Sequence, residues 1–242
     1  MRSAFDKLIS WTGLALAVVL LAAGGLLTWA NTFIGDQVKE QFGNQDITMP
    51  YGPAVDSLPD ADRKEMSKFA EDGQNKLDSG PEAKAYADHY IYSHMKSAGQ
   101  ALLDRVEAAG VTQIPVEGGE PNPMPEEMNY SNASTIAGAV AAAAEEAKSA
   151  GDTAKAEELT ALSEEINATR MSTFLNGNTL RGLLLYGYAF ATMGTIAGIA
   201  AIASFAGAAF LLVLFALGLV HANRAKKAEL TTNHKVGTPV SA

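Results

Sequence analysis

The sequence of 242 residues contains no cysteine. The chain can therefore form no disulfide bond, thiolate metal site or cysteine nucleophile, and its fold must be held by packing alone. It also contains no glycine-rich phosphate loop of the form G-x-x-x-x-G-K or G-x-G-x-x-G, and no G-x-S-x-G turn. These absences remove the common sequence signatures of nucleotide-binding proteins and of serine hydrolases.

Charge is missing from a long stretch near the N-terminus. No residue from Leu8 to Gly35 is charged, and Trp11 and Trp29 stand near the two ends of this run. The run is long enough to cross about 30 Å of hydrocarbon, and tryptophan favours the membrane interface. We expect a transmembrane helix at 8–33 that stays attached as a signal anchor. The alternative, a cleaved signal peptide, has an apolar region of only about 7–15 residues.

A second uncharged stretch covers 182–222 if His221 is neutral. As one helix it would be about 60 Å long, which exceeds a single crossing. We expect one crossing at about 196–220, with the preceding residues outside the hydrocarbon. A turn near Met193–Thr195 would instead allow two crossings here and three in all. Lysine and arginine beside spans mark the cytoplasmic side, and both ends of the chain carry them, which favours an even number.

The segment between the two apolar runs is strongly acidic. Residues 35–181 contain 25 acidic and 12 basic side chains, which gives this segment a net charge of −13. The whole chain has a net charge of −9, because the two ends are basic. Such a surface repels phosphate backbones, so we expect no nucleic-acid partner. We predict an all-α membrane protein of the plasma membrane, in which two transmembrane helices extend into an extracytoplasmic helical bundle. Its segments are a cytoplasmic N-terminus at 1–7, the first span at 8–33, an acidic extracytoplasmic domain at 34–181, an apolar helix at 182–222 and a basic, disordered cytoplasmic tail at 223–242.

Helical periodicity and helix-breaking residues divide the acidic segment. The first span is expected to continue as a helix until Gly43–Asn44, followed by an extended stretch rich in proline. Further helices are predicted at 60–77, 81–109, 134–150 and 152–175, with Leu159, Leu162, Ile166 and Met171 facing inward in the last. Residues 111–132 read as an exposed loop, and Asn176–Asn178 as a break before the final helix.

Small residues in the apolar runs suggest close helix packing. Gly194 and Gly198 lie four apart on one stripe of the second span, where they allow another backbone to approach. We expect this stripe to pack against Gly24 and Gly25 of the first span, or against another subunit.

The residues before the second span are candidates for an interaction surface. In a continuous helix Arg170 and Arg181 would share one face, and Tyr186 and Tyr188 follow them. The arginines could contact lipid phosphate or pair with carboxylates of the domain. Alternatively, they could form a docking surface for a partner membrane protein.

No residue cluster predicts catalysis, a cofactor or a firm metal site. His89 and His94 are five apart, or about 140° around a helix, so they cannot ligate one metal from one face. Carboxylates in the loop at 111–132 could bind a cation weakly, but they lack the spacing of a calcium loop. Neither span contains a charge, which argues against a transporter or proton relay.

Three motifs after the first span carry a family resemblance: Asp46-Ile47-Thr48, the stretch from Ala85 to Ile91 with His94, and the stretch from Thr173 to Gly182. This pattern resembles a group of actinobacterial membrane proteins that carry the label "aromatic ring-opening dioxygenase LigA". Ring-opening dioxygenases of that type hold iron with two histidines and a carboxylate, and this chain offers no matching cluster. The resemblance therefore implies a membrane protein without an assigned activity.

Together these features predict a non-catalytic integral membrane protein with no cofactor. We expect an accessory or scaffold subunit, whose partners are the lipid bilayer and another membrane protein or a second copy of itself. An extracytoplasmic module that binds or senses a small ligand or cation is the main alternative, and a membrane-anchored enzyme is the third.

Overall fold

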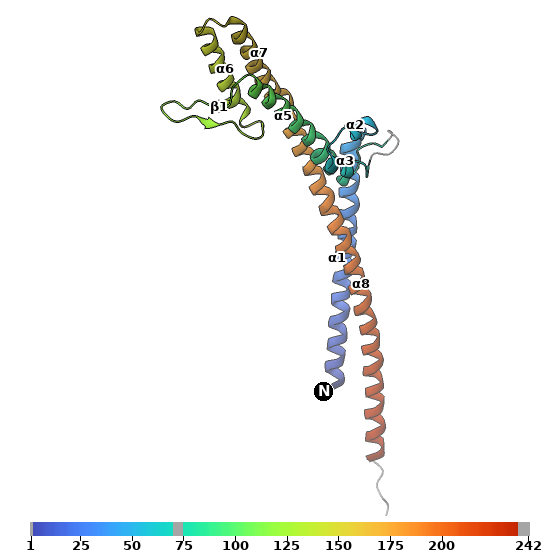
Figure 1. Cartoon of the computed structure of the whole chain (residues 1–242). Coiled ribbons are helices and arrows are strands. Elements are labelled where there is room, and N and C mark those ends of the chain that lie inside the picture. The colour runs from blue at the N-terminus through green and yellow to red at the C-terminus, as the bar shows by residue number, and fades with distance from the viewer. Residues whose placement is uncertain (1, 70–74, 237–242) are drawn as a thin grey trace, which may run out of the picture. The chain divides into compact units, whose positions relative to one another are not determined.

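The structure is a computed structural model that describes residues 2–69 and 75–236. The chain is mostly helical and divides into two compact units. We call Met1–Gln37 with Ala191–Ala242 the helix-pair unit, and Val38–Phe190 the central unit. Two long helices contribute to both: α1 spans Arg2–Gly43 and α8 spans Asn176–Val236 (Figure 1). The expected helical class with two long apolar helices is thus confirmed.

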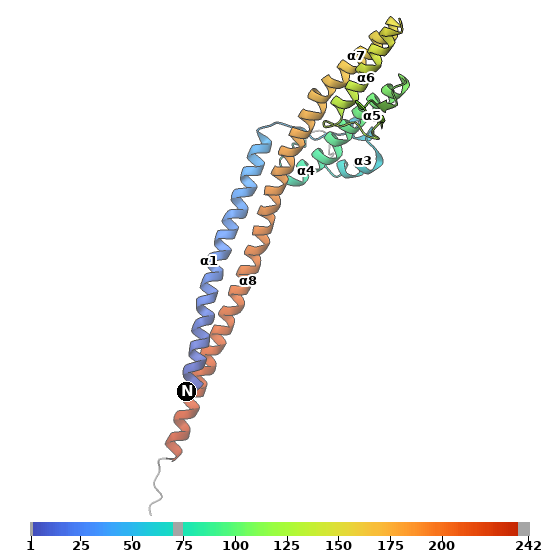
Figure 2. The same cartoon turned by 90° about the vertical axis from the view of Figure 1, so that its left-hand side faces the viewer.

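Within the helix-pair unit, α1 and α8 lie side by side in both views (Figures 1 and 2). Their contacts show an antiparallel arrangement, since they run from Gly194 against Ile34, through Phe205 against Gly24, to Gly218 against Ser10. A Cβ atom at Gly194 would lie 3.0 Å from Ile34 Cγ2, so a glycine is what allows this close approach. The residues buried in the pair are small: Ser10, Ala17, Ala201, Ala208 and Ala222.

Most of the apolar surface of these helices is uncovered by protein. In each helix only 11% of the most apolar window is buried, and each is long and apolar enough to cross a membrane. Large side chains such as Leu26, Ile202 and Leu217 are more than 60% exposed. Helix α8 passes through Met193–Thr195 without interruption, so the turn required for three crossings is not present.

The central unit contains two continuous helical runs and several short elements. The first run joins α4 (Gly80–Ala85), a π-helical segment η1 (Tyr86–Ile91) and α5 (Tyr92–Ala108). The second joins α7 (Thr153–Thr169), a π-helical segment η2 (Arg170–Leu175) and α8. The remaining elements are α2 (Pro53–Asp56), α3 (Asp60–Met66), α6 (Ala133–Ser149) and the short antiparallel strands β1 (Gln113–Ile114) and β2 (Asn122–Pro123).

The ends of several helices lie where the sequence predicts them. Helix α1 ends at Gly43, and the two alanine-rich helices α6 and α7 are separated by Gly151. Gly110 and Gly151 have φ values of 83° and 84°, in the left-handed region that glycine enters without strain.

The predicted helix at 60–77 is wrong, because α3 already ends at Met66. Leu77 lies outside any helix instead, and its N–H donates to the Ile47 carbonyl at 2.9 Å. The Met49 N–H likewise donates to the Asn75 carbonyl at 2.8 Å. Buried backbone groups need partners, and this pairing supplies them to the proline-rich stretch, which cannot form a helix.

Two predictions about the second helical run are also wrong. Met171 is 49% exposed, whereas Phe174 is buried at 1% exposure, because η2 changes the helical register over Arg170–Leu175. No break occurs at Asn176–Asn178, where α8 begins directly after η2. Gly177 has a packing role instead, since a Cβ there would lie 2.5 Å from Met95 Sδ.

Two apolar clusters fill the central unit. One lies among α5, α6, α7 and η2 and includes Leu102, Ile136 and Ile166. It also takes in Val111 and Met128, so the segment 111–132 is anchored at both ends rather than exposed throughout. The other surrounds Phe42 and Leu184 and joins the end of α1, the extended stretch, α3, α4, η1 and the start of α8.

Candidate functional site

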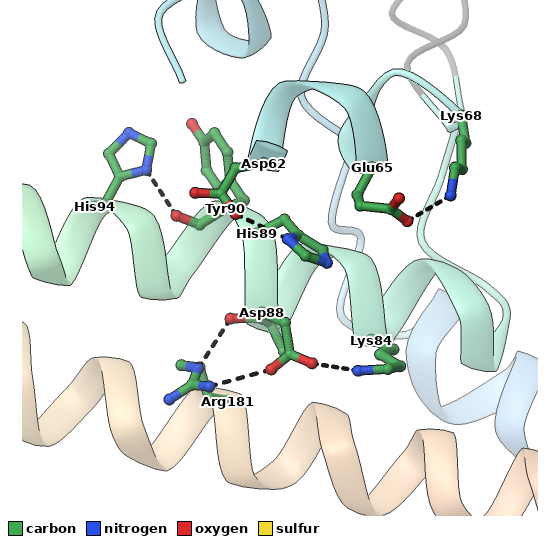
Figure 3. A network of polar contacts seen from close by, with 10 residues as sticks. Asp62, Glu65, Lys68, Lys84, Asp88, His89, Tyr90, His94 and Arg181 are labelled. Atoms are coloured by element: carbon green, nitrogen blue, oxygen red, sulfur yellow. Dashed lines mark hydrogen bonds and ion pairs between the residues drawn. The ribbon is translucent and has the colours of Figure 1, made fainter. Parts of the chain in front are cut away.

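A network of polar contacts in the central unit surrounds Asp88, on η1 (Figure 3). Its carboxylate accepts hydrogen bonds from Lys84, one turn earlier, and from Arg181 of α8 at 3.1 Å. Arg181 Nε also donates to the Ala87 carbonyl at 2.9 Å. We call Lys84, Ala87, Asp88 and Arg181 the Asp88 network. It joins η1 to α8, which are far apart in the sequence.

The π-helical segment explains why Arg181 finds a carbonyl to bind. At the end of η1 the Tyr92 N–H donates to the Ala87 carbonyl, five residues earlier. This wider turn places the Ala87 carbonyl where it also accepts from the guanidinium. The guanidinium carbon lies 4.3 Å from the centre of the Tyr92 ring, which adds a cation–π contact. Three groups therefore hold Arg181 in one orientation.

Asp88 is ionised within this network. Partial burial raises the pKa of its carboxyl, but the hydrogen bonds and positive charges of Lys84 and Arg181 outweigh it, so the pKa lies below its usual value. The side chain is 23% exposed, so solvent screens these charges only in part. The ion pair between Asp88 and Arg181 is consequently a structural contact that acid should weaken.

We predict that Asp88→Asn makes stability less sensitive to acid. Because the folded-state pKa of Asp88 is depressed, its stabilising contribution is complete above the unfolded value of about 3.9 and is lost as pH falls through the folded pKa. The variant should be less stable than wild type at pH 7 and lose less stability between pH 5 and pH 3. Urea unfolding of the detergent-solubilised chain measures both, with Asp104→Asn as an exposed control. An unchanged acid slope in Asp88→Asn would contradict the assignment.

The two histidines of η1 and α5 have separate partners. His89 Nδ1 lies 2.8 Å from Asp62 Oδ1, a contact that joins η1 to α3. His94 Nδ1 lies 2.8 Å from the Tyr90 carbonyl and its ring packs on the Tyr90 ring. Among the residues that the structure describes, no three histidine, aspartate or glutamate side chains gather closely enough to hold a metal.

A cavity of about 430 Å³ lies beside this region of the central unit. Met95, Met128 and Phe174 provide its apolar lining, and Asp62, Tyr92, Lys96 and Glu127 its polar lining. Lys96 and Glu127 form an ion pair at 3.0 Å. Glu127 is therefore one carboxylate of the segment 111–132 that pairs with a lysine. The volume falls within the range of small-molecule sites, about 300–1,000 Å³.

The structure separates the two arginines that the sequence places on one face. Arg170 Nε donates to the Tyr130 carbonyl at 3.1 Å, and its guanidinium carbon lies 4.5 Å from the Tyr130 ring centre. Arg181 belongs to the Asp88 network, as the alternative of a salt bridge to a domain carboxylate predicts. Tyr186 is 70% exposed on α8, whereas Tyr188 lies near Lys84, whose ammonium is 5.7 Å from its ring centre.

The four glycines predicted to form a helix seam meet different neighbours. Gly194 and Gly198 contact Ile34 and Asn31 of α1 rather than Gly24 and Gly25. Gly24 instead receives the Phe205 ring, with 2.9 Å from an ideal Cβ to Phe205 Cε1. A Cβ at Gly25 would meet nothing within 4 Å, so this residue lies outside the seam.

Sequence reasoning missed Asp88, Lys84, Asp62 and His89 as partners. The spacing of four between Lys84 and Asp88 is a recognisable helical ion-pair signal. The pairing of Asp88 with Arg181 spans 93 positions, and that of Asp62 with His89 joins two helices, so no local pattern could reveal either.

Comparison of the chain with protein-family models, with curated proteins and with solved structures found no match. The functional argument therefore depends on the geometry of the chain itself.

Proposed function

We propose that the protein is a non-catalytic integral membrane protein with two spans. Both termini lie in the cytoplasm, and the central unit lies on the extracytoplasmic side of the plasma membrane. Its role is that of an accessory or scaffold subunit, which docks on another membrane protein or on a second copy of itself.

The observation that carries the membrane part is the uncovered apolar surface of the helix-pair unit. Each apolar window is only 11% buried, and burying apolar surface releases about 25 cal/mol per Å². A core helix of a soluble protein would be covered by neighbours, whereas hydrocarbon covers a transmembrane helix. The basic residues beside both spans support a cytoplasmic position of the termini.

The absence of cysteine from the sequence permits a direct test of this topology. Ser149→Cys places one thiol at the exposed end of α6, and Ser241→Cys places one in the C-terminal tail. In sealed, right-side-out membrane vesicles, an impermeant maleimide should label Ser149→Cys at once and Ser241→Cys only after permeabilisation. The wild-type chain provides a background without thiols. Protection of Ser149→Cys, or release of the protein by carbonate washing, would refute the proposal.

The docking part is supported by an exposed stripe on α8 within the central unit. Leu183, Tyr186 and Phe190 are 60%, 70% and 56% exposed, and their spacing of three and four places them on one helix face. Aromatic side chains are enriched in the centres of protein interfaces, and an exposed apolar stripe is costly to leave in water. We assign the contact with a partner to this stripe.

Photo-crosslinking tests the docking surface in native membranes. With p-benzoylphenylalanine in place of Tyr186, irradiation should give one discrete adduct, either a dimer of this chain or a complex with one other membrane protein. Tyr51, which is 52% exposed elsewhere in the central unit, provides the matched control position. Crosslinks from position 186 to lipid alone, or equal adducts from both positions, would contradict docking through the stripe.

The cavity beside Tyr92 favours a second candidate, a module that binds a small ligand outside the cell. Its lining combines apolar side chains with a few polar groups, as ligand sites do. A ligand bound at 100 times its Kd would stabilise the full chain by about 2.7 kcal/mol. A thermal-shift screen would find such a ligand, and Ser97→Phe, which narrows the cavity, should abolish the shift. A flat screen would exclude this candidate.

A further inference from the structure

The helix-pair unit contains an apolar groove that no described helix fills. It has a volume of about 500 Å³ and lies between the first turns of α1 and the distal part of α8. Leu214 and Phe215 form apolar walls, and Gly13 and Gly218 leave space where side chains would otherwise stand. Ser10 and His221 also line it and give one end polar character.

Two cations lie one turn beyond that polar end. Lys7 precedes Ser10 by three residues on α1, and Arg224 follows His221 by three residues on α8. Residues three apart are neighbours on a helix face, and the two helices are antiparallel, so both cations lie at the same end of the groove. Both are exposed, and neither forms an ion pair with a side chain that the structure describes.

We propose that this groove binds an anionic phospholipid, with an acyl chain along Gly13 and Leu214 and the headgroup phosphate on Lys7 and Arg224. An acyl chain matches the apolar walls, and a phosphate matches two exposed cations at one end of the groove. A zwitterionic lipid carries no net charge and gains less from the same pair. The inference rests on the proposed membrane insertion.

Tryptophan fluorescence can report on this site, because the sequence contains only Trp11 and Trp29. The Trp11 ring packs on Phe215, which lines the groove, at 5.9 Å between centroids. Trp29 packs on Phe33 elsewhere on α1, at 5.4 Å. Trp29→Phe therefore leaves a reporter at the groove, and Trp11→Phe leaves a reporter away from it.

The experiment reconstitutes full-length protein into phosphatidylcholine bilayers that contain brominated lipid, which quenches nearby tryptophan. Brominated phosphatidylglycerol should compete for quenching of Trp11 with a preference on the order of tenfold over brominated phosphatidylcholine. Trp29 should show no such preference. Lys7→Gln with Arg224→Gln should remove the preference at Trp11, whereas Lys64→Gln, an exposed charge in the central unit, should leave it unchanged.

Gly13→Leu separates binding in the groove from general attraction to a basic surface. A Cβ at Gly13 meets nothing within 4 Å, and Gly13 lines the groove, so a leucine there has room to extend into it. It should reduce the preference at least severalfold, and Gly25→Leu, where a Cβ is equally free, should not. Equal quenching by both lipids, or a preference that survives Gly13→Leu, would overturn the site. Absence of quenching at both tryptophans would refute membrane insertion instead.

Discussion

Arg181→Met is expected to destabilise the central unit by about 2–4 kcal/mol, because it removes one partner of a partly buried ion pair. The Asp88 side chain, at 23% exposure, would keep only Lys84 as a cation, and the Ala87 carbonyl would lose one donor. Methionine preserves the length and the apolar stem of the side chain, so the loss reports mainly on charge and hydrogen bonding. Urea unfolding of the detergent-solubilised chain at pH 7 measures the change.

Arg105→Met provides a matched control for this variant. Arg105 also pairs with a carboxylate, Glu165, but both side chains are about half exposed. Exposed ion pairs contribute roughly 0–1 kcal/mol, so the control should be nearly as stable as wild type. If the two variants lost stability equally, the Asp88 network would stabilise the fold no more than an exposed ion pair does.

Gly187→Ala should destabilise the central unit by about 1–3 kcal/mol through overpacking. A Cβ atom at Gly187 would collide with the ring of Phe42, which is only 4% exposed and belongs to a core cluster. The ring would have to move within a packed core, or the helices would have to separate. Thermal unfolding followed by circular dichroism measures the change, as a melting temperature several degrees lower.

Gly182→Ala on the same helix should have the opposite sign. A Cβ at Gly182 meets nothing within 4 Å, and alanine favours a helix over glycine by about 1 kcal/mol. The two variants thus compare the same glycine-to-alanine change at a position packed against Phe42 and at a position with no neighbouring side chain. A stabilising effect at both positions would show that Phe42 does not pack against Gly187.

Arg181 and Gly187 lie on one face of α8. Gly177, Arg181, Leu184 and Gly187 follow one another at spacings of three and four, and each contacts or is buried against the rest of the central unit. The exposed stripe of Leu183, Tyr186 and Phe190 lies on the opposite side of the same helix. One face of α8 thus holds the fold, and the other is available for the proposed partner.

Several features of the fold follow from local composition and could be predicted from the sequence. The long uncharged runs determine the two apolar helices, because apolar side chains at every helical position leave no polar face. The helix ends near Gly43, Gly110 and Gly151 follow from local signals, since glycine next to turn-forming residues favours a helix stop, and Gly110 and Gly151 adopt a left-handed φ. The uninterrupted helix through Met193–Thr195 agrees with the single crossing expected from the basic residues at both ends of the chain, whereas length alone also allowed two short helices there.

The tertiary structure decided every feature that depends on distant residues. Arg181 and Asp88 are 93 positions apart, and the Leu77 N–H pairs with the Ile47 carbonyl, 30 positions earlier. The register change at η2, which buried Phe174 and exposed Met171, has no signal in the spacing of apolar residues. The sequence alone determined where the chain is apolar and where its helices stop, because those properties depend on neighbouring residues. Packing decided which polar groups meet and which helix face is exposed, because both depend on distant parts of the chain folded together.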